Sequence, residues 1–176
     1  DTALLGEGAL ASLRHGASML QPWGLMVPAG AKVLVQPVEL LPLGGSEWDL
    51  RALHDVLFRD SGGRCLRLST LPHRLLGPAV DALCLDFAAL GQPSASTPTT
   101  VELPILQAGQ ATALVWWFEL QFPGNGVLSA GMHSQQRTWK QMAVFLAEPP
   151  HVEVGDIMHA IIDYDEFAVR VKYVTS

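Results

Sequence analysis

The chain has 176 residues, of which 49% are hydrophobic and only 16% are charged, and its formal net charge is −6 at pH 7. This length suits one domain with one sizeable core, and the composition excludes an intrinsically disordered chain. The sequence contains no cluster of lysine and arginine that could follow a phosphate backbone, so nucleic acid is disfavoured as a direct ligand, whereas cationic partners are tolerated.

The sequence also limits where the protein works. No apolar run approaches the roughly 18 residues of a membrane-spanning helix, and the first residues lack the basic leader of a signal peptide. Cys65 and Cys84 lie among apolar neighbours without CxxC spacing, which favours reduced thiols in the core. We therefore expect a soluble protein of the cytoplasm, the nucleus or both, without a membrane partner.

The hydrophobic pattern changes once near the start of the chain. Apolar side chains at a spacing of three to four predict one short amphipathic helix, at positions 9, 10, 13, 17 and 20. Alternation over 31–40 then predicts a strand. Ser46 can cap a second helix over 47–58, whose apolar face includes Trp48 and Leu53.

From residue 64 onward the pattern is almost entirely that of short strands. Strands are predicted over 65–69, 79–87, 100–106, 111–122, 126–129, 138–147, 156–163 and 167–174. The segment 91–99 is rich in turn-forming residues and predicts an exposed loop. Many short strands without intervening helices indicate a mainly β fold, an antiparallel barrel or sandwich, with a short N-terminal helix and a helical insertion near 47–58.

Few residues carry a recognisable chemical motif. The six histidines form no HxH or HxxxH pair, so no metal site is indicated. The segment Gly6–Gly8 has no strand before it and no Lys-Ser/Thr after it, which argues against a phosphate-binding loop. No GxSxG motif is present, and neither cysteine has the electropositive surroundings of a nucleophile.

Glu7 is the first candidate for a functional side chain, because it lies between two glycines just before the predicted helix. It can be a helix-start acid favoured by the helix dipole. Alternatively, the glycines let a ligand approach closely, and the carboxylate can hold a cation such as guanidinium by two hydrogen bonds. Spacing alone leaves both interpretations open.

The second candidate is the segment Arg137–Gln141, in which Trp139 is either simple packing at the start of a strand or part of a binding loop. A third aromatic cluster, Trp116-Trp117-Phe118, lies within the strand predicted over 111–122. Alternate rings of a strand point to opposite faces, so core packing is the default interpretation there.

Taken in order, several segments resemble the protein arginine methyltransferase family. Asp1–Leu10 is similar to the end of that family's double-glutamate loop and the helix after it, and Leu25–Ala31 is similar to its GG-x-[IL]-x-P entry into a β-barrel. Arg137–Gln141 resembles the threonine-histidine-tryptophan loop. Further similar segments are Val115–Phe118, Leu128–Gly131, Val144–Leu146 and Gly155-Asp156.

The resemblance implies transfer of methyl from S-adenosylmethionine to a peptide arginine. Glu7 would match the second glutamate and act as the catalytic residue, and Thr138 and Trp139 would bind substrate by shaping the arginine pocket. The Leu-Gly-Glu-Gly form is most like the branches with duplicated modules, which make monomethyl or symmetric dimethyl arginine. Arginine-containing proteins would be substrates, and a homodimer or a pairing of duplicated modules would use the 47–58 insertion as an arm; the alternative is that the insertion packs back on the barrel.

Two departures from the family qualify these expectations. Thr138 stands where the family usually has histidine, so a histidine-carboxylate pair cannot form from this position. The domain that binds S-adenosylmethionine, and the first glutamate, would lie upstream of Asp1. We therefore expect 1–24 to be a loop remnant and linking helix, 25–176 to be a β-barrel substrate-binding domain, and the chain alone to be inactive. The alternative is a non-catalytic β-barrel module that binds a partner protein.

Overall fold

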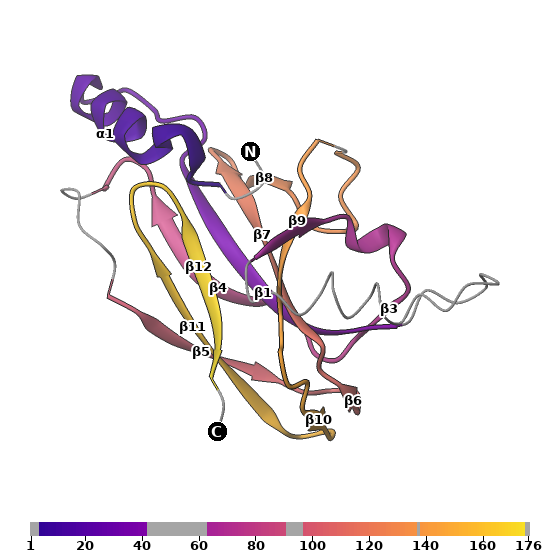
Figure 1. Cartoon of the computed structure of the whole chain (residues 1–176). Coiled ribbons are helices and arrows are strands. Elements are labelled where there is room, and N and C mark those ends of the chain that lie inside the picture. The colour runs from indigo at the N-terminus through magenta and orange to yellow at the C-terminus, as the bar shows by residue number, and fades with distance from the viewer. Residues whose placement is uncertain (1–3, 42–62, 91–96, 137, 175–176) are drawn as a thin grey trace.

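The computed structural model describes residues 4–41, 63–90, 97–136 and 138–174, and the side chain of Glu7 is not described (Figure 1). The insertion predicted over 47–58 lies outside the described residues. The helical elements are η1 (Gly6–Gly8), α1 (Ala9–Met19) and η2 (Leu68–Thr70). No helix of the described parts of the chain is long and apolar enough to cross a membrane.

The described structure is mainly β, and all its strand pairs are antiparallel. The strands are β1 (Gly30–Leu40), β2 (Arg64–Leu66), β3 (His73–Leu75), β4 (Val80–Asp86), β5 (Thr99–Pro104), β6 (Gly109–Gln110), β7 (Ala113–Phe122), β8 (Gly126–Ser129), β9 (Gln141–Phe145), β10 (His151–Val152), β11 (Ile157–Tyr164) and β12 (Val169–Val174). They form sheets of seven, two and three strands, so the predicted antiparallel β class is confirmed, although the sheets do not close into one barrel.

β1 and β7 pair along almost their whole lengths and form the centre of the large sheet. On its other edge, each of these two strands pairs with one strand along its first half and with a different strand along its second half. β4 pairs with β1 up to Val35 and β3 pairs with it from Val38; likewise β9 pairs with β7 up to Trp116 and β8 from Glu119. The segments that connect these partner strands therefore leave the sheet beside Gln36 and Trp117.

The central strands are covered on both faces, which explains why β7 is so apolar. One core cluster unites Val33, Val35 and Trp116 with the sheet of β5, β11 and β12. The second cluster unites Val38 and Trp117 with residues of β9 and η2, among others. A strand buried on both faces loses the usual alternation of polar and apolar residues.

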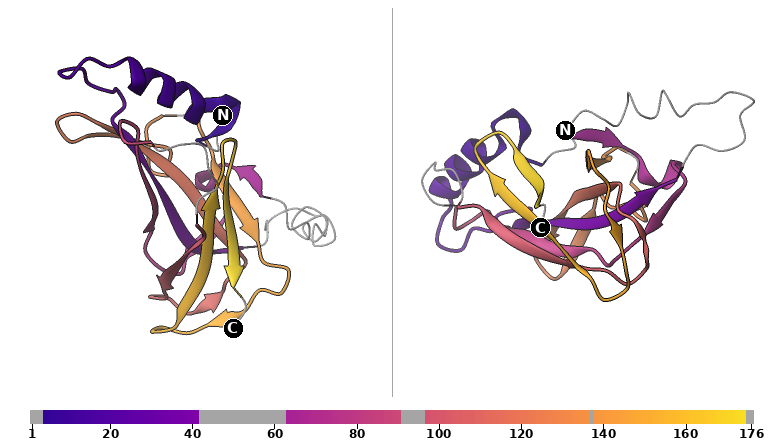
Figure 2. Two further views of the ribbon diagram at one scale, coloured as in Figure 1. Left: turned by 90° about the vertical axis from the view of Figure 1, so that its left-hand side faces the viewer. Right: turned by 60° about the horizontal axis from the view of Figure 1, so that its bottom comes forward.

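α1 lies across one end of the β structure (Figures 1 and 2). Leu10 is buried in the first core cluster, and Leu13 packs against that cluster. The Arg14 guanidinium donates to both carboxylate oxygens of Glu166, at 2.6 and 2.7 Å, and so fixes the helix to the turn between β11 and β12. The end of the predicted apolar face is not buried, because Leu20 is exposed.

The prediction that the two cysteines are core thiols is wrong, since Cys65 and Cys84 are both exposed. Cys65 lies on the short strand β2, which pairs only with β9 in the described structure. On β4 the register with β1 shifts between Val33 and Leu34, as in a β-bulge. The bulge reverses the alternation after Asp81, so that Cys84 shares the exposed face with this aspartate.

Candidate functional site

Glu7 lies in η1, the single 3-10 turn that leads into α1. The α-helix itself begins at Ala9, and its N-cap is Gly8, whose φ of 72° is in the left-handed region that favours glycine. Glu7 therefore precedes the helix instead of lying in its first turn, which contains no acidic residue. Leu5 is fully buried beside it and anchors this segment in the core.

The loop between β8 and β9 places Trp139. The Gln136 side chain holds the backbone of Trp139 from both sides: the Trp139 N–H donates to Oε1 at 2.8 Å, and Nε2 donates to the Trp139 carbonyl at 3.2 Å. The indole ring packs edge-on against Phe118, with ring centroids 5.1 Å apart. Trp139 is thus half-buried and oriented by both backbone and ring contacts.

Gln141, at the start of β9, fixes the end of the same loop. Its side chain is 3% exposed. The Leu68 N–H donates to its Oε1 at 2.9 Å, and its Nε2 donates to the Ala130 carbonyl at 2.6 Å. One buried amide therefore ties the start of β9 to η2 and to the end of β8, and both backbone groups are satisfied away from water.

These contacts frame a mostly polar pocket of about 500 Å³, called here the Trp139 pocket. It is lined by Arg67, Ser69, Thr70, Gly131, Met132, Ser134, Gln136, Trp139 and Gln141. Thr138 is exposed and is not among these lining residues. None of the described lining residues is acidic.

The structure thus brings Trp139 and Gln141 to one pocket and leaves Thr138 at the loop surface. Leu4 packs against both core clusters, and Trp139 packs against the second, so the segment before Glu7 reaches the cluster that supports the pocket. Sequence reasoning missed Gln136 and Arg67. A glutamine three residues before an aromatic residue gives no signal that it will hold that residue's backbone.

Comparison with solved structures defines the class of fold. A chain of the Trypanosoma brucei PRMT1 enzyme-prozyme heterotetrameric complex with AdoHcy matches with a TM-score of 0.66 at 14% identity, over 98% of this chain and 61% of that chain. At this level of identity the match shows a shared fold.

Sequence comparison shows a relationship to the arginine methyltransferases. The chain is 31% identical over 180 residues to an arginine N(omega)-methyltransferase from Streptomyces achromogenes subsp. streptozoticus, covering 98% of this chain and 49% of that relative. It is 27% identical over 195 residues to protein arginine N-methyltransferase 7 of Xenopus laevis, covering 96% of this chain and 28% of that relative. No protein-family model matches the chain. The chain is a relative of the protein arginine methyltransferases and spans about half or less of the length of these two proteins.

Proposed function

We propose that this chain is the substrate-binding β part of an arginine N-methyltransferase that uses S-adenosylmethionine and acts on arginine side chains of proteins. The observation that carries the proposal is the similarity over nearly the whole chain to proteins named as arginine methyltransferases. The pocket around Trp139 supports it, because this tryptophan, in the segment that resembles the family's loop, lines a cavity.

The described residues do not fit S-adenosylmethionine. Dinucleotide-like cofactor sites use a parallel strand, a glycine-rich turn and a helix. Every strand pair in the described structure is antiparallel, and α1 follows a 3-10 turn with no described strand before it. We therefore assign the cofactor to a part of the protein outside this chain, and expect the chain alone to be inactive.

The chain's own contribution would be to hold the arginine. The Glu7 carboxylate would accept two hydrogen bonds from the guanidinium, an arrangement that fixes the plane of the group as well as its position. The Trp139 ring would form a wall of the arginine pocket, kept in place by Gln136 and Phe118. Positioning of this kind is a major part of catalysis when one reactant is already activated.

The test is incorporation of labelled methyl groups from S-adenosylmethionine by the complete protein. An arginine-containing peptide should be methylated, and the same peptide with lysine in place of arginine should not. If neither the peptide nor free arginine accepts methyl groups, the non-catalytic interaction module becomes the better account.

A second acceptor, free arginine, is favoured by one specific observation. The Streptomyces relative is named simply as an arginine N(omega)-methyltransferase, whereas the name of the Xenopus relative specifies protein arginine. Competition separates the two cases. If free arginine is methylated faster than the peptide at equal concentration, the amino acid is the substrate; the reverse order supports the protein.

We also propose that the complete protein self-associates or pairs duplicated modules through the segment 47–58. The fold relative comes from a heterotetrameric complex, which supports pairing of this kind. Replacing Trp48 and Leu53 with serine should lower the sedimentation coefficient of the complete protein. An unchanged sedimentation profile would contradict the proposal that the segment 47–58 mediates association.

A further inference from the structure

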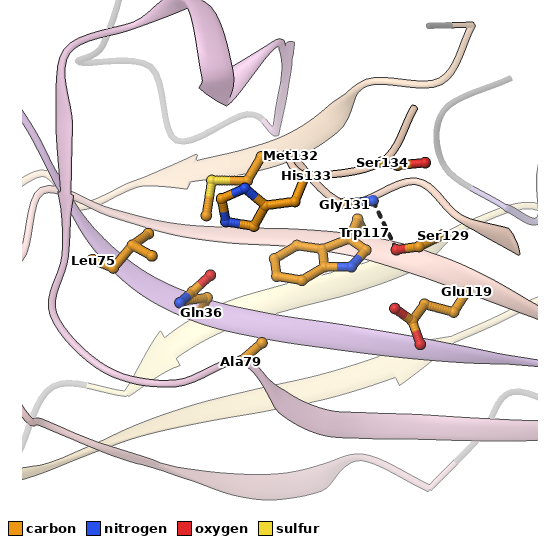
Figure 3. A pocket seen from close by; sticks show the side chains of 10 residues that line it. All are labelled: Gln36, Leu75, Ala79, Trp117, Glu119, Ser129, Gly131, Met132, His133 and Ser134. Carbon is orange, nitrogen blue, oxygen red and sulfur yellow. Dashed lines mark hydrogen bonds between the residues drawn. The ribbon is translucent and has the colours of Figure 1, made fainter. Parts of the chain in front are cut away.

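One cavity of about 390 Å³ adjoins the Trp139 pocket (Figure 3). It lies beside Gln36 and Trp117 and shares a wall that includes Gly131 with that pocket. The Trp117 indole N–H has no hydrogen-bond partner within the described structure, but Gly131 covers it, since a Cβ there would lie 2.9 Å from the indole nitrogen. This cavity therefore belongs to the candidate site.

Another cavity, of about 510 Å³, lies between β9 and β12 and is called here the β9–β12 groove. It is lined by Val144, Phe145, Leu146, Ala147, Glu148, Val171, Lys172 and Tyr173. None of these residues lines the Trp139 pocket. β9 belongs to the large sheet, and β12 is an edge strand of the three-stranded sheet, so the groove lies where these two sheets do not join.

β12 turns a row of backbone groups toward this groove. The Asp165 N–H donates to the Ala168 carbonyl at 3.0 Å, which makes these two residues a hydrogen-bonded pair of the hairpin. Such pairs alternate along an antiparallel ladder, so the backbone of Lys172 bonds to β11, whereas the N–H and C=O groups of Val171 and Tyr173 point to the opposite edge. Within the described ranges, no strand pairs with that edge.

The floor of the groove is apolar and its rims are charged. Val171 is only 5% exposed, and Val144 and Tyr173 pack against the first core cluster. Lys172 is exposed on the β12 side, and Glu148 is exposed on the β9 side. Because side chains of a strand alternate between its faces, a strand laid along β12 would place one set on this floor and the other set beside Lys172.

We propose that an extended segment of the complete protein, outside residues 1–176, pairs with β12 in this groove. Its backbone bonds to the N–H and C=O groups of Val171 and Tyr173, its inward side chains are apolar, and its residue beside Lys172 is acidic. The two curated relatives contain further chain that could supply such a segment, because the match spans 49% and 28% of them. The inference concerns strand pairing and does not depend on methyl transfer.

Two other occupants fit the groove less well. If a second copy of β12 paired antiparallel with the first and Val171 lay opposite Tyr173, then Lys172 would lie opposite Lys172 of the other copy. If Val171 lay opposite itself, Lys172 would lie opposite Arg170, and like charges directly opposite are destabilising. A separate short peptide would lose its translational and rotational freedom on binding, whereas a segment of the same chain has a high effective concentration.

The test is amide hydrogen exchange of the complete protein, measured residue by residue by NMR. The N–H groups of Val171 and Tyr173 should be protected as strongly as the N–H of Lys172, which bonds to β11. A nuclear Overhauser effect between the Tyr173 N–H and an Hα atom outside residues 1–176 should then identify the segment.

Val127 provides a matched control on an unpaired edge of β8. The Ala130 N–H donates to the Phe118 carbonyl, so by the same alternation the Val127 N–H points away from β7. Val127 is 58% exposed, and its protection factor should be at least about a hundredfold lower than that of Tyr173.

A charge reversal tests the acidic partner. Lys172→Glu should lower the protection factor of Tyr173 about threefold, as expected for loss of an exposed ion pair. Lys140→Glu, at an exposed position outside the groove, should leave it unchanged. An unchanged value in Lys172→Glu overturns the assignment of an acidic residue.

Three results overturn the pairing itself. The first is a Tyr173 N–H that exchanges as fast as that of Val127. The second is protection that rises with protein concentration, which would identify a second copy as the occupant. The third is protection that appears only after addition of acetyl-Val-Asp-Val-amide, which would identify a separate partner.

Discussion

Removing the amide of Gln141 should destabilise the protein strongly, because it deprives two buried backbone groups of their partners. In Gln141→Ala the Leu68 N–H loses its acceptor and the Ala130 carbonyl loses its donor. Each unsatisfied buried group costs about 1 to 3 kcal/mol, so for the two groups we expect the free energy of unfolding to fall by roughly 2 to 6 kcal/mol. Urea denaturation followed by circular dichroism measures this loss.

A matched control and a second variant make the reasoning refutable. Gln110 is exposed and its amide donates to the Pro149 carbonyl at 3.5 Å, so Gln110→Ala should change the free energy by no more than about 0.5 kcal/mol. Gln141→Met keeps most of the side-chain volume and cannot bridge the two backbone groups in the same way. If Gln141→Met is as stable as the wild type, the loss in the alanine variant comes from a cavity and the hydrogen-bond argument is wrong.

Three further predictions concern other parts of the molecule. Gly131→Ala should destabilise the protein by about 1 to 3 kcal/mol in thermal unfolding, because the new Cβ would crowd Trp117; a wild-type melting temperature contradicts this. Hydrogen bonds from the Arg170 guanidinium and from the Phe167 N–H lower the pKa of Asp165 below its ordinary value of 3.8. The ionised Asp165 carboxylate therefore stabilises the fold fully above pH 3.8, and this stabilisation is lost as the pH falls through the lowered pKa. An NMR titration should show the pKa of Asp165 rising in Arg170→Gln, and no change would refute the assignment. Cys65 and Cys84 are exposed, so both should react rapidly with a thiol reagent in the folded chain, and protection of either would argue against this placement.

The sequence predicted most of the β framework, because alternation marks the long strands with one exposed face and a continuous apolar run marks β7, which is buried on both faces. The alternation over 31–40 became β1, and the predicted strand 126–129 is β8. β3, β6 and β10, with three, two and two residues, were missed because such short strands contain too few residues to show a period. The prediction that Cys84 is buried was wrong for a different reason. A β-bulge reverses the face on which the following residues lie, and the sequence pattern does not show it.

The candidate site was predictable only in part. The family resemblance pointed to Trp139, and the structure places that side chain at a pocket. The roles of Gln136 and Gln141 depend on backbone groups that only the folded loop brings near them. The unpartnered N–H of Trp117 could not be foreseen at all, because a buried aromatic residue in an apolar strand is the ordinary case.

The central claim is that Glu7 holds the substrate guanidinium, and the rate of methyl incorporation into an arginine peptide by the complete protein tests it most directly. Removing one member of a buried charge pair typically costs about 3 to 5 kcal/mol, so Glu7→Gln should reduce the rate by a few hundred-fold or more while the circular dichroism spectrum stays unchanged. Glu102→Gln, at an exposed position on β5, should retain the wild-type rate. A near-wild-type rate for Glu7→Gln would contradict the account and leave Glu7 as an acid of the 3-10 turn without a role in methyl transfer.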